Sequence, residues 1–292
     1  MELKVIAIAR NGHTDKFGIP RQSREESPIL TRIVFEPEYN VREALRGIEG
    51  YSHLWLIWGF SEVPSGKVPS DKVPSDKVPS TKEWSPTVRP PRLGGNKRMG
   101  VFATRSPFRP NPIGLSSVKN LTPKGSMDVH WTSNRAEPFT HSREGVYIGE
   151  SGRIELIVSG ADVLDGTPIY DIKPYLSFSD SHPDARNGFA EETKDRELEV
   201  DWSLVANECS VIDGFVSYES PPNHPLITPL SPPYHPLLRG KMAEIDYILR
   251  QDPRPGYQND PEREYKMDYA GWRVTFRVNS NSVAVVCQVS KI

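Results

Sequence analysis

Apolar segments in this chain are short, and proline or glycine repeatedly separates one from the next. The 292 residues include 28 Pro and 21 Gly, and both residue types disfavour the interior of a helix. Turns and short strands are therefore favoured over a helical bundle. Segments with the composition or alternation of strands lie at 3–9, 53–60, 99–103, 113–118, 153–158 and 168–173.

The strand pattern predicts a mainly β fold with a barrel-like domain over residues 1–183. Ile154, Leu156 and Val158 alternate with other residues, as expected of a half-buried strand. Asn40 is a suitable N-cap for a short helix over 41–46. The chain is long enough for two domains.

Residues 184–292 are expected to form a linker and a small α+β domain. A helix is predicted at 241–250, followed by a hairpin that turns at 279–282. Alternating apolar residues mark both strands of this hairpin. The first strand carries Val274, Phe276 and Val278, and the second carries Val283, Val285, Cys287 and Val289.

Residues 63–82 are four tandem five-residue units, VPSGK, VPSDK, VPSDK and VPSTK. The proline in every unit excludes a regular helix or a central strand, so we expect an extended, mobile insertion. A period of five with one small apolar residue per unit matches no stacked-repeat architecture. The sequence assigns no function to this tract.

Charge is distributed unevenly, although the net charge is only −2. From Trp84 to Ser126 there are eight Lys and Arg and no Asp or Glu. From Asp180 to Glu219 there are eleven acids and three Lys or Arg. The acid-free segment indicates a polyanionic partner such as RNA, although a solvated basic loop is the simpler alternative.

Several enzyme classes are excluded by missing motifs. The sequence has no P-loop, no GxSxG elbow, no HExxH, and no GxGxxG turn of the Rossmann type. Its two cysteines are far apart and its seven histidines are scattered singly, so we expect neither a disulfide framework nor a metal site. No apolar run could cross a bilayer, and no secretory signal is recognisable. A cytoplasmic location is therefore expected.

Four loop segments concentrate charged and rigid residues, at 18–22, 89–96, 103–114 and 162–175. In 105–112, three prolines restrict the backbone, so two arginines and an asparagine lose little entropy on binding. The alternative is a rigid turn in which Arg109 caps carbonyl groups. Asp162, Asp165 and Asp171 could accept hydrogen bonds from a ribose or an amine, but Asp165 followed by glycine also fits an ordinary turn.

These loops carry motifs of a known family. The chain resembles the TsaA-like, or TrmO, tRNA adenosine N6-methyltransferases at 20–22 (PRQ), 50–55 (GYSHLW), 89–96 (RPPRLGGN), 99–106 (MGVFATRS), 108–114 (FRPNPIG), 165–168 (DGTP) and 171–175 (DIKPY). A further segment, 251–257 (QDPRPGY), resembles the C-terminal motif of the longer bacterial form. The resemblance implies a β-barrel domain that binds S-adenosylmethionine (AdoMet) without a Rossmann fold, and a homodimer.

The same resemblance implies a substrate adenosine beside the anticodon, at position 37 of tRNA, that already carries an N6-threonylcarbamoyl group. Residues 11–13 (NGH) replace a usual Ser-Pro-Tyr of the family, and Ser61-Glu62 replaces His-Gln, which introduces an acid near the ligand. The AdoMet contacts of the family fall on Pro20, Arg21, Gln22, Ser61, Glu62, Arg105, Leu115, Ser159, Gly160, Ala161 and Asp162.

Methyl transfer is an in-line displacement, so positioning should dominate catalysis. The N6 atom must also lose a proton, which Asp162, Asp252 or Tyr257 could accept. Phosphates and unpaired bases of the RNA are expected at Arg92, Asn96, Arg98, Arg109, Asn111 and Arg254. Two alternatives remain: a non-catalytic AdoMet-dependent RNA-binding module, and a methyltransferase that acts on another substrate.

Overall fold

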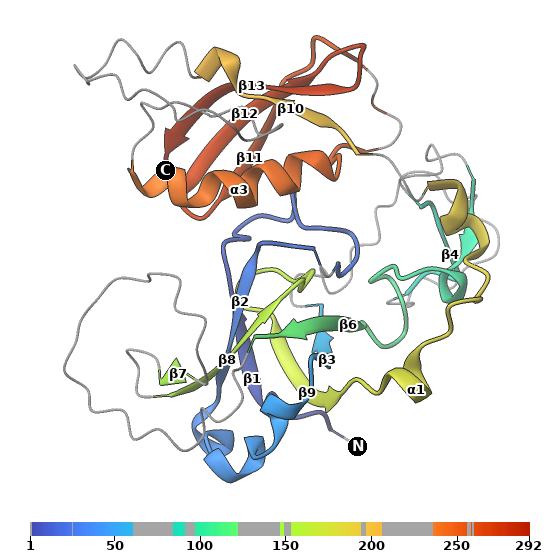
Figure 1. The fold of residues 1–292 in the computed structure, drawn as a ribbon. Coiled ribbons are helices and arrows are strands. Elements are labelled where there is room, and N and C mark those ends of the chain that lie inside the picture. Colours follow the sequence, from blue (N-terminus) through green and yellow to red (C-terminus); the bar gives the residue numbers. More distant parts are fainter. Residues whose placement is uncertain are drawn as a thin grey trace. The chain divides into compact units, whose positions relative to one another are not determined.

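The protein is represented by a computed structural model that describes residues 2–24, 26–60, 84–90, 97–121, 147–148, 153–193, 197–205, 236–255, 258 and 260–292. Two compact units are present (Figure 1). The N-terminal unit contains 1–11, 21–194 and 255–257, and the C-terminal unit contains 12–20, 195–254 and 258–292. The repeats at 63–82 lie outside the described residues. A domain boundary after residue 183 stays a prediction.

A seven-stranded antiparallel sheet forms the N-terminal unit, in the order β2-β1-β9-β3-β6-β8-β7. A further pairing between β2 and β8 joins the two sides, so the six longer strands close into a ring (Figure 1). These strands are β1 (Ala7–Arg10), β2 (Leu30–Phe35), β3 (His53–Gly59), β6 (Ile113–Asn120), β8 (Ile154–Ser159) and β9 (Pro168–Pro174), and β7 is Tyr147–Ile148. The predicted mainly β fold is confirmed.

All six strands of the ring contribute to one apolar core. Residues with no exposed surface include Ala7, Ile33, Leu54, Leu156 and Ile169. Along β2 and β6 buried and less buried side chains alternate, which is the period of two expected when one face of a strand packs inward. The strand predicted at 113–118 is thus found as β6, whereas β2 has the same alternation but was not predicted.

Shorter elements surround the ring. A two-stranded sheet joins β4 (Thr87–Val88) to β5 (Met99–Gly100). The short helices of the described residues in this unit are η1 (Pro37–Tyr39), η2 (Arg42–Leu45), η3 (Ile48–Gly50), η5 (Val101–Ala103), α1 (Ser177–Asp180) and η7 (Gly188–Thr193).

Three local predictions in the N-terminal unit are wrong. The helix expected over 41–46 is the 3-10 turn η2, and Asn40 does not cap it, because its Oδ1 accepts a hydrogen bond from the backbone N–H of Ile154 at 2.7 Å. The strand expected at 99–103 ends at Gly100, where η5 begins. Strand β8 is not half-buried, since Glu155 is also buried, with its carboxylate 3.2 Å from the Arg32 guanidinium.

The C-terminal unit is α+β, as predicted. Its sheet has the order β10-β13-β12-β11, and α3 (Pro236–Arg250) lies along one face (Figure 1). The strands are β10 (Glu199–Asp201), β11 (Tyr265–Tyr269), β12 (Trp272–Val278) and β13 (Val283–Lys291). Met242, Ile245, Ile248 and Leu249 are buried on α3, a spacing that places them on one face of the helix. The predicted hairpin is confirmed, and Asn279 Oδ1 accepts the N–H groups of Asn281 and Val283 in its turn.

His13 packs inside the C-terminal unit. Its side chain is 1 % exposed, and its ring meets Tyr269 edge-on at 5.1 Å between centroids. Burial lowers the pKa of His13 from 6.5 to about 4, because desolvation disfavours the charged imidazolium. His13 is therefore neutral in the folded protein at neutral pH.

The C-terminal unit should lose stability as the pH falls from 6.5 to about 4. In that window the unfolded chain binds a proton that folded His13 does not, which costs about 3 kcal/mol of unfolding free energy. Urea unfolding at several pH values measures the slope, and His13→Gln should flatten it. His182→Gln, at an exposed position, should leave the slope unchanged. Equal slopes for His13→Gln and wild type would contradict the assignment.

Candidate functional site

A carboxyl group, Asp162, lies partly buried just after β8 in the N-terminal unit. The hydroxyl of Ser116 on β6 donates to Asp162 Oδ1, and Trp58 Nε1 on β3 donates to the same hydroxyl oxygen at 2.8 Å. Burial raises the pKa of Asp162 above its usual value, although the Ser116 hydrogen bond and the charge of Arg105 partly offset the effect. Such a carboxylate is a stronger base than an exposed one.

Residues 22–24 are held against Asp162 and strand β6. The backbone N–H of Ser23 donates to Asp162, and its hydroxyl donates to the carbonyl of Ser117 on β6. Gly160 has a φ of +83°, and a Cβ there would lie 2.5 Å from the carbonyl oxygen of Arg24. Only glycine accommodates both the left-handed backbone and this close approach. The segment after β8 is thereby fixed beside residues 22–24.

Arg105 brings a positive charge to this cluster. Its guanidinium donates to Gln22 Oε1, and its charge acts on Asp162. Leu115 on β6 keeps 54 % of its surface exposed. The structure thus brings together Gln22, Arg105, Gly160 and Asp162. These residues come from separate parts of the sequence, and the family resemblance predicts all four as cofactor contacts. We call Gln22, Ser23, Arg105, Ser116 and Asp162 the Asp162 cluster.

The other predicted cofactor contacts are placed as follows. Ser159 and Ala161 are buried on either side of Gly160, and Arg21 is partly buried. Pro20 belongs to the C-terminal unit. Ser61 and Glu62 lie outside the described residues.

Sequence reasoning missed three members of this arrangement, Ser23, Ser116 and Trp58. Ser116 is 2 % exposed in the middle of a strand, and its position in the alternation of β6 matches that of the buried Val118. A polar residue at an inward strand position is unusual because a buried hydroxyl needs a partner. That signal was available in the sequence, but the identity of the partner was not.

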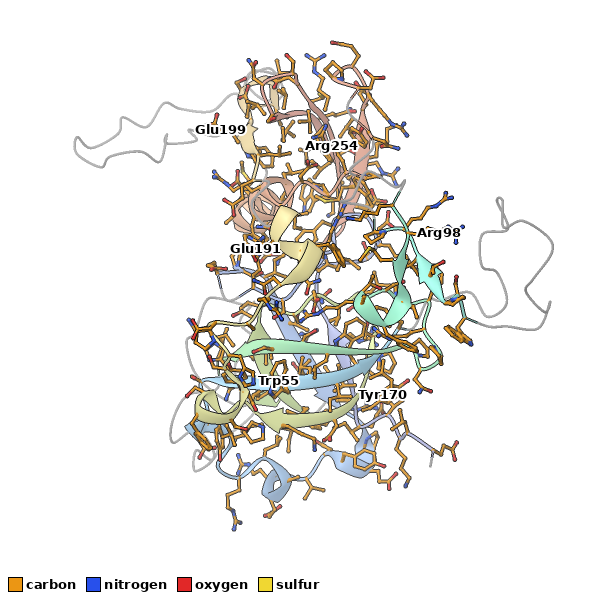
Figure 2. All side chains as sticks on the ribbon, turned by 90° about the vertical axis from the view of Figure 1, so that its right-hand side faces the viewer. Trp55, Arg98, Tyr170, Glu191, Glu199 and Arg254 are labelled. Atoms are coloured by element: carbon orange, nitrogen blue, oxygen red, sulfur yellow. The ribbon has the colours of Figure 1, made fainter. Side chains whose placement is uncertain are left out.

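Three of the predicted RNA contacts of the N-terminal unit, Arg98, Arg109 and Asn111, are among the described residues. Arg98 is exposed beside β4 and β5 (Figure 2), and its guanidinium donates to Thr87 Oγ1 at 2.9 Å. Arg109 is partly buried and donates to the Thr104 carbonyl at 3.3 Å, which is the carbonyl cap foreseen as an alternative. Asn111 is exposed, and Arg92 and Asn96 lie outside the described residues.

The C-terminal motif ends α3. Asp252 adopts a left-handed φ of +46°, and its N–H donates to the Leu249 carbonyl at 3.1 Å. Its carboxylate accepts Arg254 Nε at 2.8 Å and Nη2 at 3.0 Å, and both side chains are 11 % exposed. Arg254 is therefore engaged within the unit. Tyr257 lies outside the described residues.

Asp165 and Asp171 have structural partners. Asp165 accepts the backbone N–H of Asn11 at 3.0 Å and Arg10 Nη1 at 3.2 Å, and Gly166 has a φ of +82°. Asp171 pairs with Lys173 at 2.8 Å. The ordinary turn thus accounts for Asp165 and Gly166.

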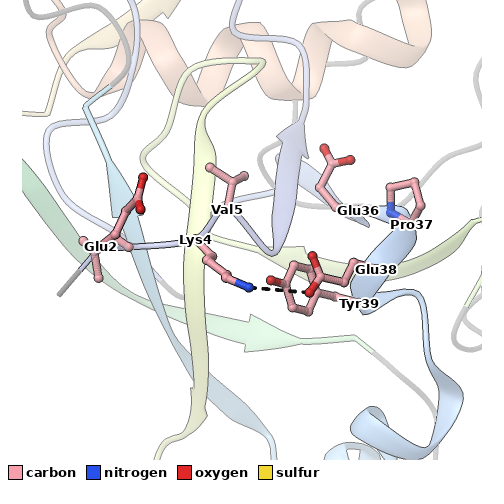
Figure 3. A pocket seen from close by; sticks show the side chains of 8 residues that line it. Glu2, Lys4, Val5, Glu36, Pro37, Glu38 and Tyr39 are labelled. Carbon is pink, nitrogen blue, oxygen red and sulfur yellow. Dashed lines mark ion pairs between the residues drawn. The ribbon is translucent and has the colours of Figure 1, made fainter.

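Two surface hollows formed by described residues of the N-terminal unit lie apart from the Asp162 cluster. One, of about 570 Å³, is lined by 2–5 and 36–39, with Lys4 and Glu38 paired at 3.6 Å (Figure 3). Another lies at 181–185. Among the described residues no group of His, Cys, Asp or Glu is arranged to hold a metal ion, and none of their helices is long and apolar enough to span a bilayer.

Comparison with known proteins identifies the family of this chain. It is 40 % identical to a tRNA (adenine(37)-N6)-methyltransferase of Eikenella corrodens, covering 69 % of this chain and 85 % of the relative. It is 32 % identical to the protein of that name from Escherichia coli K12, covering 95 % and 91 %. Crystal structures of TrmO, one of them from Pseudomonas aeruginosa, superpose with TM-scores of 0.60 and 0.59 at 25 % identity, over 99 % of this chain and 99 % and 98 % of theirs. Residues 8–181 match the tRNA-methyltransferase O N-terminal domain and 238–292 the TrmO C-terminal domain, so the chain belongs to the TrmO family.

Proposed function

We propose that this protein transfers the methyl group of AdoMet to N6 of threonylcarbamoyl-adenosine 37, beside the anticodon of a tRNA. Two relatives carry the name tRNA (adenine(37)-N6)-methyltransferase, and this chain aligns with at least 85 % of the length of each. The observation that carries the proposal is the partly buried Asp162 carboxyl, held beside Arg105 and Gln22 by residues from separate loops and strands.

The side chains around Asp162 fit AdoMet chemically. When bound, AdoMet supplies a methyl group made electrophilic by a positively charged sulfur. Arg105 offers a cation for its carboxylate, and the exposed surface of Leu115 offers an apolar contact for its adenine. Gln22 and the backbone of 159–162 supply further polar contacts. Relatives described as S-adenosylmethionine-dependent or S-adenosylmethionine-binding are consistent with this assignment.

Asp162 is the base that we assign to the reaction. The N6 atom of threonylcarbamoyl-adenosine is a poor nucleophile, because its lone pair is delocalised into the carbamoyl carbonyl, and it must lose its proton. Burial raises the pKa of Asp162 and so increases its affinity for that proton. Ser116 and Ser23 donate hydrogen bonds that fix the carboxylate orientation. Asp252 and Tyr257 remain candidates for the same role.

Further parts of the proposal extend beyond the chemistry. We assign the cofactor to a barrel formed by the N-terminal unit, with contacts at Arg21, Ser61 and Glu62 in addition to the Asp162 cluster, Leu115 and residues 159–161. Pro20 is proposed as a contact on the family resemblance alone. The RNA contacts proposed are Arg92, Asn96, Arg98, Arg109, Asn111 and Arg254. The working form proposed is a cytoplasmic homodimer.

Incubation with labelled AdoMet and tRNA tests the function directly. The tRNA is prepared with and without its threonylcarbamoyl group, and incorporated label is mapped to the nucleoside. Label at N6 of the modified adenosine alone is the expected result. Binding of tRNA and AdoMet without incorporation would indicate a non-catalytic RNA-binding module. Incorporation into protein or a small molecule, but not tRNA, would indicate another substrate.

Arg109→Ala should weaken tRNA binding and flatten its dependence on salt. Each phosphate contact releases counterions, so losing one reduces the slope of log affinity against log salt by about 1. Filter binding over a salt series measures this slope, and Arg98→Ala should reduce it similarly. Arg46→Ala, at an exposed arginine outside the acid-free segment, is the control. Affinity of Arg109→Ala equal to wild type at every salt concentration would contradict the assignment.

A further inference from the structure

Two aromatic side chains form an exposed surface in the N-terminal unit. The rings of Trp84 and Phe102 stack with centroids 6.1 Å apart and planes inclined by 29°. Phe102 keeps 72 % of its surface exposed, whereas Trp84 is partly buried. Exposing an aromatic ring to this extent forgoes the burial that usually stabilises it. We call this pair the Trp84–Phe102 platform.

The backbone fixes the outward direction of Phe102. Its neighbour Val101 is 1 % exposed, and the Val101 N–H donates to the Pro86 carbonyl at 2.9 Å. The Val101 carbonyl accepts both the N–H and the hydroxyl of Thr104, at 3.1 and 2.8 Å. Because the turn is tied down on both sides of Val101, the following residue is presented to solvent with little ordering entropy left to lose.

Positively charged residues flank the platform along the chain. It lies in the acid-free segment from Trp84 to Ser126, and Arg89, Lys97 and Arg98 are all exposed near β4 and β5. Arg98 is steadied by its hydrogen bond to Thr87. Phe178 provides a contrast, because it is 87 % exposed but lies two residues before Asp180, where the acid-rich segment begins. An aromatic face with neighbouring cations suits a stacked base whose phosphates carry negative charge.

We propose that the Trp84–Phe102 platform stacks an unpaired base of the RNA substrate. The inference rests on the proposed function, since RNA is the polyanion that function requires. Single-stranded loops present unstacked bases that aromatic side chains hold, while arginines and lysines hold the phosphates. The platform therefore contributes affinity by stacking, separately from the salt-dependent phosphate contacts.

Phe102→Ala should weaken binding of an anticodon stem–loop RNA by about five- to a hundredfold, the loss expected for one stacked base. The slope of affinity against salt should stay at the wild-type value, because no phosphate contact is removed. Phe102→Tyr retains a π-face and should bind as wild type does. Phe178→Ala, which removes an even more exposed ring elsewhere in the unit, should also bind normally. The full-length protein without AdoMet is used, and circular dichroism checks that each variant is folded.

Three results would overturn the platform. The first is an RNA affinity of Phe102→Ala equal to that of the wild type, and the second is a wild type that does not bind RNA. The third is a change in the oligomeric mass of Phe102→Ala in sedimentation, which would show that the surface mediates contact between copies of the chain. Failure of the proposed function is distinguishable. If the wild type binds RNA without methylating it, the proposed methyl transfer is wrong, but the RNA affinity of Phe102→Ala still tests base stacking on the platform. If the wild type methylates tRNA and Phe102→Ala binds RNA as the wild type does, only the proposed base stacking is wrong.

Discussion

Asp162→Asn should slow tRNA methylation by about 100- to 10,000-fold, the contribution typical of a positioned general base. The amide keeps the shape of the carboxyl and can still accept the Ser116 hydroxyl, but it cannot take the N6 proton. Single-turnover methylation with saturating AdoMet measures the chemical step. Glu38→Gln, at an exposed acid outside the Asp162 cluster, should leave the rate unchanged.

The pH dependence separates this role from a structural one. In wild type the rate should fall as the pH decreases through the raised pKa of Asp162, because protonation removes the base. Asp162→Asn should lose that acidic limb. Its stability at neutral pH should equal or exceed that of wild type, since a raised folded pKa means that the ionised carboxyl is disfavoured there. Full methylation by a folded Asp162→Asn would assign the proton transfer to another group.

Asp252→Ala should destabilise the C-terminal unit by about 3–5 kcal/mol. Removing one partner of a largely buried ion pair leaves the Arg254 charge uncompensated, and the carboxylate that accepts both Nε and Nη2 is lost. Arg254→Ala should cost a similar amount, and the double variant should cost less than the sum of the two. Urea unfolding of the single and double variants measures the coupling.

The same variants decide whether Asp252 has a chemical role. If its role is to end α3 and pair with Arg254, the loss of methylation in Asp252→Ala should track the unfolded fraction and recover at temperatures where the variant is folded. A folded Asp252→Asn that binds tRNA and AdoMet but does not methylate would instead place Asp252 in the reaction. Asp268, which pairs with Arg273 at 2.6 Å, offers Asp268→Ala as a control for a more exposed ion pair.

Strands were predictable where burial follows the period of two. His53–Gly59 and Ile113–Asn120 largely agree with the expected ranges, 53–60 and 113–118, because each packs one face into the core of the ring. The prediction failed where a distant partner overrides a local preference. Asn40 is a good helix cap by itself, but its oxygen is used by the start of β8. Glu155 is buried because Arg32 on the neighbouring strand neutralises it.

The candidate site was predictable in its parts but not as an assembly. Family resemblance points to Gln22, Arg105 and Asp162, and the structure brings these three together. The Ser116 and Trp58 hydrogen bonds depend on which strands are neighbours, and strand order is not encoded by any local pattern. Likewise, nothing in the local sequence signals that Arg254 pairs with Asp252 two residues earlier.

Closure of the six strands bears on the tandem VPSxK units. These units follow β3 in the chain, and β3 already has hydrogen-bonded neighbours on both sides, β6 and β9. The number of units therefore cannot change the pairing of β3, because both of its edges are already occupied. From the sequence we expect a flexible connection, and the entropy cost of closing such a connection grows by only about 0.6 kcal/mol for each doubling of its length. The pairing of β3 thus sets no limit on the number of units.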